Sequence, residues 1–239
     1  MPVEQNKIDI VFDFDDTLTE DTLTRLPTRY GVDANAFWLE DVASLSEDGW
    51  DPPLGYMKAM LDLTKNNGAL SLSSLKNSDL FEFGQTLDFY EGVRQFLDQI
   101  PVCLGSQPDW VEAEVNVEFY IVTGGLQEIV DGCPIRDSFR DVWGCSFQGD
   151  ASTGVISFPK NSMTFTDKTR FLFQINKGIV GPDSRTNPNA VNKDVSPEER
   201  PIPFHNMIYI GDGLTDIPCF SLVESGNGVG RVCKVGDGD

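Results

Sequence analysis

The sequence has 239 residues, with 18 Lys and Arg against 38 Asp and Glu, and its formal net charge is −20. This charge argues against a protein that coats nucleic acid or an anionic membrane, because such binding depends on Lys and Arg that neutralise phosphates. Hydrophobic residues make up 40% of the chain, which is enough for one sizeable core and a small accessory domain. A small phosphorylated ligand remains compatible with the charge, since it needs only one or two local cations.

The N-terminus and the cysteines indicate a cytoplasmic protein. Residues 1–7 are polar, and the apolar run Ile8–Phe12 is too short for a signal peptide or a membrane span. The 5 cysteines are scattered, with no Cys-x-x-Cys pair, so we expect reduced thiols and neither a disulfide framework nor a zinc site. His205 is the single histidine and has no nucleophile nearby in sequence, which disfavours Ser-His-Asp or Cys-His chemistry.

The first third of the chain begins as a strand and continues as helices. Ile8–Phe12 is β-branched and aromatic, as in a buried strand, and it ends in the acidic segment Asp13–Thr17. Helical spacing of apolar residues then predicts helices at Ala34–Leu45, Pro53–Leu63 and Ser71–Phe83. With no clear strand among them, residues 20–84 are predicted to form an inserted helical module.

The rest of the chain alternates helices and strands. Two helices are expected at Leu87–Ile100 and at Thr166–Lys177, the second closed by Gly178. Residues 181–203 are polar and rich in Pro and Asn, and they predict a surface loop with an edge hairpin at Arg200–Phe204. The expected strands are Val117–Val122, Asn206–Ile210 and Val229–Val235, whereas Phe139–Phe147 and Gly154–Phe158 are predicted to be either short strands or irregular segments.

Strands separated by helices predict an α/β fold, a doubly wound parallel sheet with helices on both faces. Residues 1–19 and 85–239 would form this core, and residues 20–84 the helical insert. Ligands of such sheets bind outside the carboxyl ends of the strands. Three strands end in polar motifs, which are Asp13–Thr17, Thr123–Gly125 and Gly211–Gly213, and we expect these motifs to meet at one edge.

The side chains expected at this edge suit phosphoryl transfer. Asp13 and Asp15, joined by Asp212 and Asp216, would crowd four carboxylates together, and a divalent cation such as Mg²⁺ relieves their repulsion. Thr123 offers a hydroxyl and a backbone N–H to an anionic oxygen. Lys168 would add a fixed positive charge, which completes a site for phosphoryl transfer to a carboxylate nucleophile.

These residues resemble the motifs of the haloacid dehalogenase (HAD) superfamily. Asp13-Phe14-Asp15-Asp16-Thr17 resembles the first motif, Asp-x-Asp-x-Thr after a hydrophobic strand, and Thr123, Lys168 and Gly211–Asp216 resemble the second, third and fourth. All four occur in the family's order. The resemblance spans about residues 8–230, and the helical insert is matched by its position rather than by its sequence.

The resemblance implies a HAD-like Rossmannoid core, a helical cap inserted after the first strand, and a role for each motif residue. Asp13 would attack phosphorus to form an aspartyl-phosphate, and Asp15 would be the general acid and base. Thr123, Gly124 and Lys168 would bind the phosphoryl oxygens. Mg²⁺ would be held by Asp13, the backbone carbonyl of Asp15 and Asp212, with Asp216 in support.

Among HAD proteins the chain looks most like the phosphoserine-phosphatase branch. That branch carries a Glu soon after the first motif that helps to select the amino acid, and Thr22 stands at its place, so the resemblance does not assign phosphoserine as the substrate. Arg25, Arg29 and Lys58 of the insert are either readers of the substrate's far end or exposed solubilising charges.

The sequence therefore predicts a Mg²⁺-dependent phosphatase for a small phosphorylated metabolite, with no nucleic-acid or membrane partner. Two alternatives remain open. One is a phosphotransferase or mutase of the same fold, and the other is a non-catalytic phosphate-binding regulatory module.

Overall fold

The structure is a computed structural model that describes residues 5–65 and 74–233. In these residues a six-stranded sheet has the order β4-β3-β2-β1-β5-β6. The strands are β1 (Lys7–Phe12), β2 (Asn116–Leu126), β3 (Asp141–Gly149), β4 (Ile156–Asn161), β5 (Met207–Gly211) and β6 (Val229–Val232). All neighbouring strands pair in parallel except β3 and β4, which are antiparallel. The predicted α/β fold is confirmed, with an antiparallel edge strand added to the parallel sheet.

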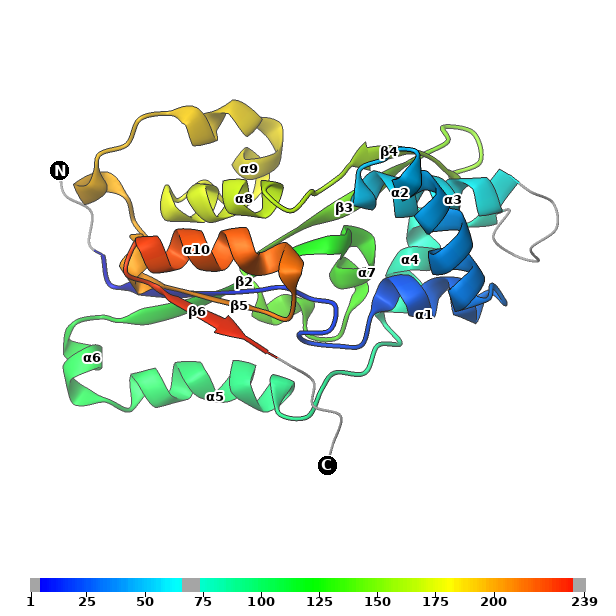
Figure 1. Ribbon diagram of the computed structural model, residues 1–239. Coiled ribbons are helices and arrows are strands. Elements are labelled where there is room, and N and C mark those ends of the chain that lie inside the picture. Colours follow the sequence, from blue (N-terminus) through cyan, green and yellow to red (C-terminus); the bar gives the residue numbers. More distant parts are fainter. Residues whose placement is uncertain (1–4, 66–73, 234–239) are drawn as a thin grey trace.

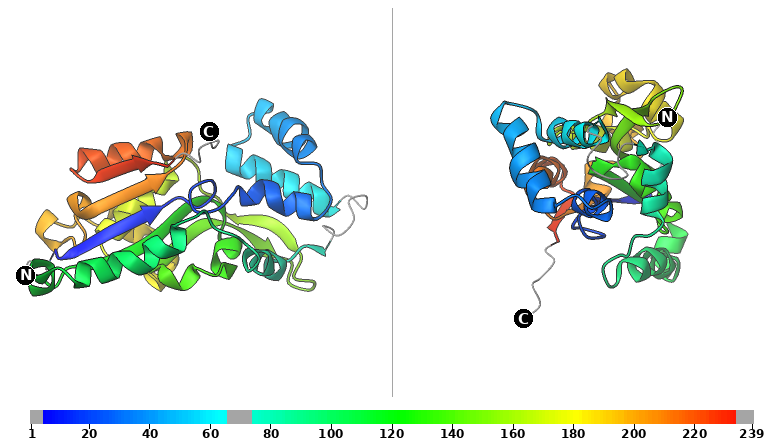
Figure 2. Two further views of the ribbon diagram at one scale, coloured as in Figure 1. Left: turned by 90° about the horizontal axis from the view of Figure 1, so that it is seen from below. Right: turned by 90° about the vertical axis from the view of Figure 1, so that its right-hand side faces the viewer.

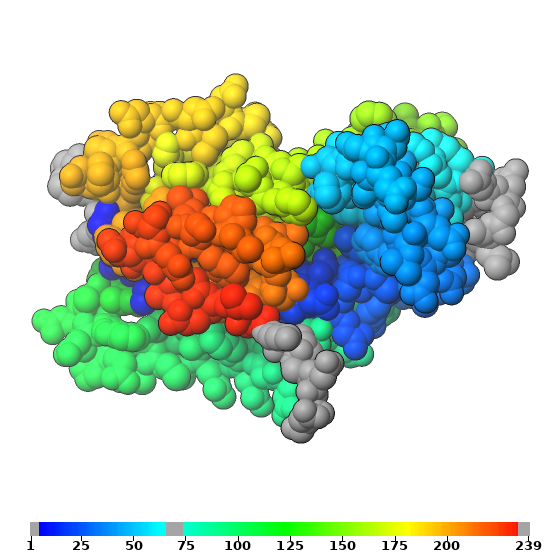
Figure 3. Space-filling model, viewed as in Figure 1, coloured from blue at the N-terminus to red at the C-terminus, as the bar shows by residue number. Residues whose placement is uncertain are grey.

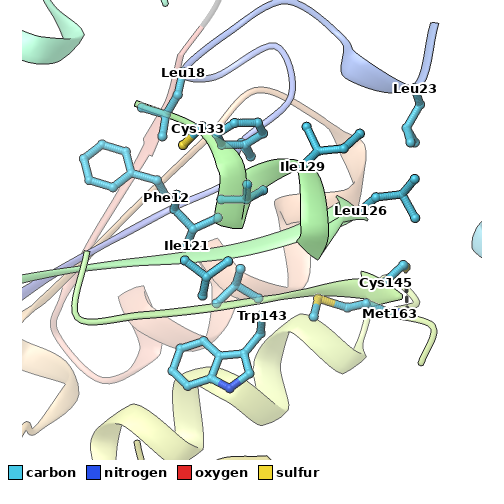
Figure 4. Packing of buried hydrophobic residues seen from close by; sticks show 14 of the residues in the cluster. Phe12, Leu18, Leu23, Ile121, Leu126, Ile129, Cys133, Trp143, Cys145 and Met163 are labelled. Carbon is cyan, nitrogen blue, oxygen red and sulfur yellow. Dashed lines mark hydrogen bonds between the residues drawn. The ribbon is translucent and has the colours of Figure 1, made fainter. Parts of the chain in front are cut away.

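Helices cover both faces of the sheet. They are α5 (Val93–Gly105), α6 (Pro108–Glu112), α7 (Gln127–Gly132), α8 (Asp167–Asn176), α9 (Pro182–Thr186) and α10 (Ile217–Ser225). Figure 1 shows α8 and α10 above the sheet and α5 below it. Phe12 on β1 meets Phe96 of α5 with 6.0 Å between ring centroids, and on the other face Trp143 of β3 meets Phe171 of α8 at 5.3 Å. Figure 4 shows Phe12 and Trp143 among the buried residues, with the Trp143 indole directed toward α8.

The predicted helical insert lies beyond the carboxyl end of β1. Its helices are α1 (Thr22–Arg29), α2 (Ala43–Glu47), α3 (Pro52–Lys65) and α4 (Asn77–Gly84), and a π-helical segment, Ala36–Val42, leads directly into α2. Figure 2 shows these blue and cyan helices gathered at one end of the sheet, and in Figure 3 their surface lies beside that of the core. α4 also packs against α7 of the core.

Several predicted boundaries differ from the observed ones. The helix predicted from Leu87 begins only at Val93, because Gly92 has φ 89°, a left-handed conformation outside the helical range. Of the helix predicted at Ser71–Phe83, residues 71–73 lie outside the described part, and α4 begins at Asn77. The end of the last predicted strand likewise falls outside, and β6 ends at Val232.

The edge hairpin predicted at Arg200–Phe204 is wrong. Pro201 and Pro203 have no backbone N–H to donate to a hairpin ladder. The segment instead runs irregularly between two 3₁₀ turns, and Ile202 is buried in the core with its carbonyl accepting a hydrogen bond from Asn176 at 2.7 Å.

None of the five cysteines forms a disulfide, and all lie in the described residues. Within residues 5–65 and 74–233, no helix has the length and apolar character that a membrane crossing requires.

Candidate active site

Asp13 stands directly after the central strand β1. Its backbone N–H donates to the carbonyl of Ile210 at 2.8 Å, which continues the pairing of β1 with β5 by one residue. Its Oδ1 accepts from the N–H of Phe14 at 2.8 Å, and the residue is 5% exposed. The carboxylate is therefore fixed at the carboxyl edge of the sheet, where the strand order places the motifs of β2 and β5 on either side.

Lys168 joins two of the predicted carboxylates. It lies in the first turn of α8 and is 2% exposed, with its Nζ 2.9 Å from Asp13 Oδ2 and 2.7 Å from Asp216 Oδ1. Burial by itself lowers the pKa of Lys168, but the charges of Asp13 and Asp216 outweigh burial and raise it, so the ammonium stays charged. The structure thus brings together residues from three distant parts of the sequence.

The Asp216 carboxylate accepts hydrogen bonds from other groups besides Lys168. Its Oδ1 also accepts from the Tyr209 hydroxyl at 2.7 Å, and its Oδ2 from the N–H of Gly213 at 3.2 Å. A Cβ at Gly211 would overlap the Asp216 carboxylate, so the fourth motif needs glycine at this position for steric reasons. Sequence analysis missed Tyr209, although its place in the strand that leads into the motif was a usable signal.

Asp13, Asp212 and Asp216 form an acidic cluster. Each offers a carboxylate oxygen, and these oxygens lie within 4.8 Å of one another. Burial and the charges of Asp13 and Asp216 raise the pKa of Asp212 to about 6, as expected where carboxylates repel. Clustered oxygen ligands are the donors that Mg²⁺ prefers, so these residues fit the predicted ion. The Asp15 carboxylate lies outside this cluster, and the predicted ligation through its backbone carbonyl stays a prediction.

Asp15 lies between the insert and the second motif. Its Oδ1 accepts from the N–H of Thr22 at 2.8 Å, and a Cβ at Gly125 would overlap its Oδ2. Burial, followed by the charge of Asp21, raises the pKa of Asp15 to about 7. A carboxyl group with this pKa can both donate and accept a proton near neutral pH.

Thr123 and Gly124 lie within β2 rather than beyond its end. The strand continues to Leu126, and its register against β3 shifts between Val122 and Leu126, an irregularity typical of strands beside active sites. Thr123 is 1% exposed, and its Oγ1 accepts from the N–H of Gly125 at 2.9 Å. The Gly124 carbonyl accepts from the hydroxyl of Tyr56 on α3 at 2.9 Å, a contact between insert and core that sequence analysis did not foresee.

A cavity of about 260 Å³ opens over these groups. Every predicted site residue except the more deeply placed Asp216 lines it, namely Asp13, Asp15, Thr123, Gly124, Lys168 and Asp212. The insert lines the opposite side through residues such as Leu23, Trp38 and Tyr56. The volume is at the lower end of the range for small-molecule sites.

Arg25, Arg29 and Lys58, the insert cations considered as substrate readers, do not line the cavity. Arg25 lies 3.8 Å from Glu20, and Lys58 is paired with Asp62 on the same helix. Arg29 donates to Thr86 at 3.2 Å. Of the two roles considered for these residues, the structure favours that of surface charges.

The comparison with known proteins supports the same fold. No protein-family model matches the sequence. An uncharacterized protein of Borreliella burgdorferi is 28% identical over 246 residues, covering 94% of this chain and 81% of that protein.

Two solved structures resemble this one over nearly the whole chain. A HAD-family hydrolase of Salmonella enterica serovar Typhi superposes with a TM-score of 0.59 and 16% identity, covering 94% of this chain but only 62% of that one. A phosphoserine phosphatase with an analogue of its phospho-aspartyl intermediate gives a TM-score of 0.53 and 14% identity, covering 96% and 95%. The chain has the fold of the HAD-family hydrolases and phosphoserine phosphatases, and the resemblance seen in the motifs is confirmed at the level of the fold.

Proposed function

We propose that this protein is a Mg²⁺-dependent phosphatase that hydrolyses a small phosphorylated metabolite through an aspartyl-phosphate. The observation that carries the proposal is the buried ammonium of Lys168, held 2.9 Å from Asp13 and 2.7 Å from Asp216 beside the cavity. A buried cation next to a carboxylate nucleophile is the arrangement needed to draw a phosphate group onto that carboxylate.

In this proposal each side chain has a defined role. Asp13 Oδ attacks phosphorus, and Lys168 with the hydroxyl of Thr123 and the N–H of Gly124 holds the phosphoryl oxygens. Asp15 gives its proton to the departing alcohol, and the resulting carboxylate then takes a proton from the water that releases phosphate from Asp13. The pKa of Asp15, raised to about 7 by burial and the charge of Asp21, suits both transfers.

Asp13 and Asp212, with the backbone carbonyl of Asp15, would hold Mg²⁺, which when bound supplies positive charge that neutralises the phosphate. Asp216 would hold Lys168 in place, since its Oδ1 contacts the ammonium directly. Residues 20–84 would act as a cap that encloses the substrate and excludes water, and the insert residues that line the cavity support this role.

The place of Asp15 favours an enzyme over the non-catalytic phosphate-binding module. Its carboxyl group lines the cavity together with Asp13, where it can give a proton to a leaving group, and a module that only binds phosphate has no need of such a donor. A phosphotransferase or mutase would use the same residues, so the assay must separate it from a phosphatase by the fate of the phosphoryl group.

The test is release of inorganic phosphate from phenyl phosphate, with Mg²⁺ or with EDTA, by the wild type and by Asp13→Asn. We expect Mg²⁺-dependent release that falls by at least about a thousandfold in the variant. Asp141→Asn is the matched control, because Asp141 is also a buried carboxylate in an ion pair, with Arg185, but lies outside the cavity. It should retain most of the activity.

Release that EDTA leaves unchanged, or that survives in Asp13→Asn, would show the mechanism to be wrong. Release of phenol that is slow in water but accelerated by added sugar acceptors, with the phosphoryl group found on the sugar rather than as inorganic phosphate, would identify a phosphotransferase instead.

A further inference from the structure

Much of the cavity lining outside the predicted phosphate-binding groups is apolar. Its lining residues include Leu23, Trp38, Val42, Pro52, Met163 and Phe165. They come from α1, the π-helical segment, the start of α3 and the loop before α8, so both the insert and the core contribute. Whatever part of a substrate extends away from the phosphate meets hydrocarbon and aromatic surface here.

The charges at the cavity are almost all negative. Lys168 is the one cation among the described lining residues, and Asp13 and Asp216 already contact it. Beyond the predicted phosphate-binding groups the lining still includes the carboxylates of Asp16 and Asp21. A second phosphate or a carboxylate on the substrate would find no cation to pair with and would be repelled.

Asp21 is held rigidly beside Trp38. It caps the N-terminus of α1, where its Oδ1 accepts from the N–H of Leu23 at 2.9 Å and its Oδ2 from the hydroxyl of Thr24. The indole N–H of Trp38 donates to the same Thr24 hydroxyl at 2.7 Å. Asp21 and Trp38 both line the cavity, and a fixed carboxylate in a largely apolar lining suits a cationic group that can pair with it.

We infer that the substrate is a phosphomonoester of an apolar alcohol that bears an amine and no second anionic group, and that Asp21 sets this preference. The inference rests on the proposed phosphatase function and adds the class of the alcohol.

The test compares two esters that differ only in the charge at their far end. Tyramine phosphate and the phosphate ester of 3-(4-hydroxyphenyl)propanoate share a phenol and a two-carbon arm, and end in an ammonium and a carboxylate respectively. Their leaving groups are nearly equal, so the ratio of kcat/KM reports recognition rather than chemistry. 4-Ethylphenyl phosphate is the uncharged reference. We expect a ratio of at least about ten in favour of the amine, equivalent to about 1.4 kcal/mol.

Asp21→Asn identifies the residue responsible. Asn keeps the oxygen that caps α1 but removes the charge, so the variant should fold and its ratio should fall toward one. Asp33→Asn is the matched control, because Asp33 accepts from the N–H of Ala36 at 2.8 Å in the same way but is exposed and lies outside the cavity lining. Its ratio should equal that of the wild type.

The outcomes separate the two proposals. If none of the esters is hydrolysed with Mg²⁺ present, the proposed phosphatase function fails and this inference with it. If all are hydrolysed but the carboxylate ester is as good as the amine, or if Asp21→Asn keeps the preference, only the inference about the alcohol is overturned.

Discussion

Lys168 is the side chain on which the electrostatics of the site depend. Its ammonium is the counter-charge for two carboxylates that are themselves almost fully buried, and leaving such charges unpaired costs about 3–5 kcal/mol. The sequence identifies Lys168 only by its place in the motif order, because Lys160 and Lys177 lie close to it in the chain and no local pattern separates the three. Lys177 lies at the opposite end of α8, where it donates to the carbonyls of Val191 and Lys193, each at 2.7 Å.

Replacing Gly125 by alanine, which adds a single methyl group, tests the role of Asp15. In Gly125→Ala the new Cβ would overlap the Oδ2 of Asp15 and push the carboxyl group out of place. A displaced proton donor should lower kcat for phosphate release by about a hundredfold, within the usual range for general acid–base catalysis. Gly105→Ala at the end of α5, where a Cβ meets nothing within 4 Å, should behave as the wild type. An unchanged kcat in Gly125→Ala would argue against the role of Asp15.

Asp9 is a buried carboxyl group outside the site. It lies on β1 opposite Glu118 of β2, is 0% exposed, and neither of its oxygens has a hydrogen-bond partner within the described residues. Burial and the charge of Glu118 raise its pKa from 3.8 to about 8. In the sequence, Asp9 appears only as an aspartate inside an apolar strand. The extent of its burial could not be predicted, because it depends on the pairing of β1 with β2 on one side and β5 on the other.

Because Asp9 has a higher pKa in the folded chain than in the unfolded one, the folded state binds more protons between about pH 4 and pH 8. The free energy of unfolding should therefore fall as the pH rises through this window. Asp9→Asn removes the titrating group, so in urea unfolding it should be about 2–5 kcal/mol more stable than the wild type above about pH 8 and show little gain near pH 4. The exposed change Asp137→Asn should follow the wild type. A gain that is equal at both pH values would contradict this assignment.

At the scale of elements, the strands were predictable and the helix ends were not. β1 and β2 are largely buried on both faces and β5 alternates buried with half-buried residues, so each appears in the sequence as an almost continuous apolar run. α1 escaped prediction because it contains Pro27 and three threonines, which have weak helix propensity, and it is stabilised instead by the Asp21 cap.

The site contact that sequence reasoning missed joins two separate elements, α3 and β2. Tyr56 on α3 and Gly124 in β2 are far apart in the chain, and no local pattern relates a helix residue to a particular carbonyl of the sheet. The motif residues could be found because they follow strands of one parallel sheet, whereas the contacts of the insert depend on how its helices pack over that edge.

Tyr56→Phe tests whether α3 is anchored to the second motif. The change removes the hydroxyl that donates to Gly124 at 2.9 Å, a hydrogen bond worth about 1 kcal/mol, and should lower kcat/KM by about three- to tenfold. Thermal unfolding should shift by only a few degrees. Tyr30→Phe is the control, since Tyr30 also belongs to the insert but lies outside the cavity lining. If both variants lose activity equally, the anchoring role is wrong.

For the molecule as a whole, the net charge of −20 divides into two parts. One part is the acidic cluster of Asp13, Asp212 and Asp216, whose repulsion a single divalent ion can relieve. The remainder is spread over the chain and is screened by any salt. The two parts should respond differently to Mg²⁺ and Na⁺.

Mg²⁺ at about a hundredfold above its Kd should stabilise the folded protein by about 2.7 kcal/mol, which raises Tm by about 5–10 °C for a chain of this size. NaCl at the same ionic strength should give a smaller rise, since it only screens. Asp212→Asn should lose the difference between the two salts while keeping the response to NaCl. Equal effects of both salts on the wild type would contradict a specific ion site.

The central position of β1 has a consequence for synthesis on the ribosome. β1 leaves the ribosome before the other strands of the sheet. It pairs on one side with β2 and on the other with β5, so the pairing of Asp9 with Met207 can form only after Met207 has left the ribosome. Until then one edge of the strand has no partner, and an open apolar edge invites association with other chains. The cluster of Asp13, Lys168 and Asp216 can therefore form only after the ribosome has translated beyond Asp216. A nascent chain stalled before residue 207 would carry a half-built sheet without a phosphate site, and it would depend on chaperones that shield the free edge.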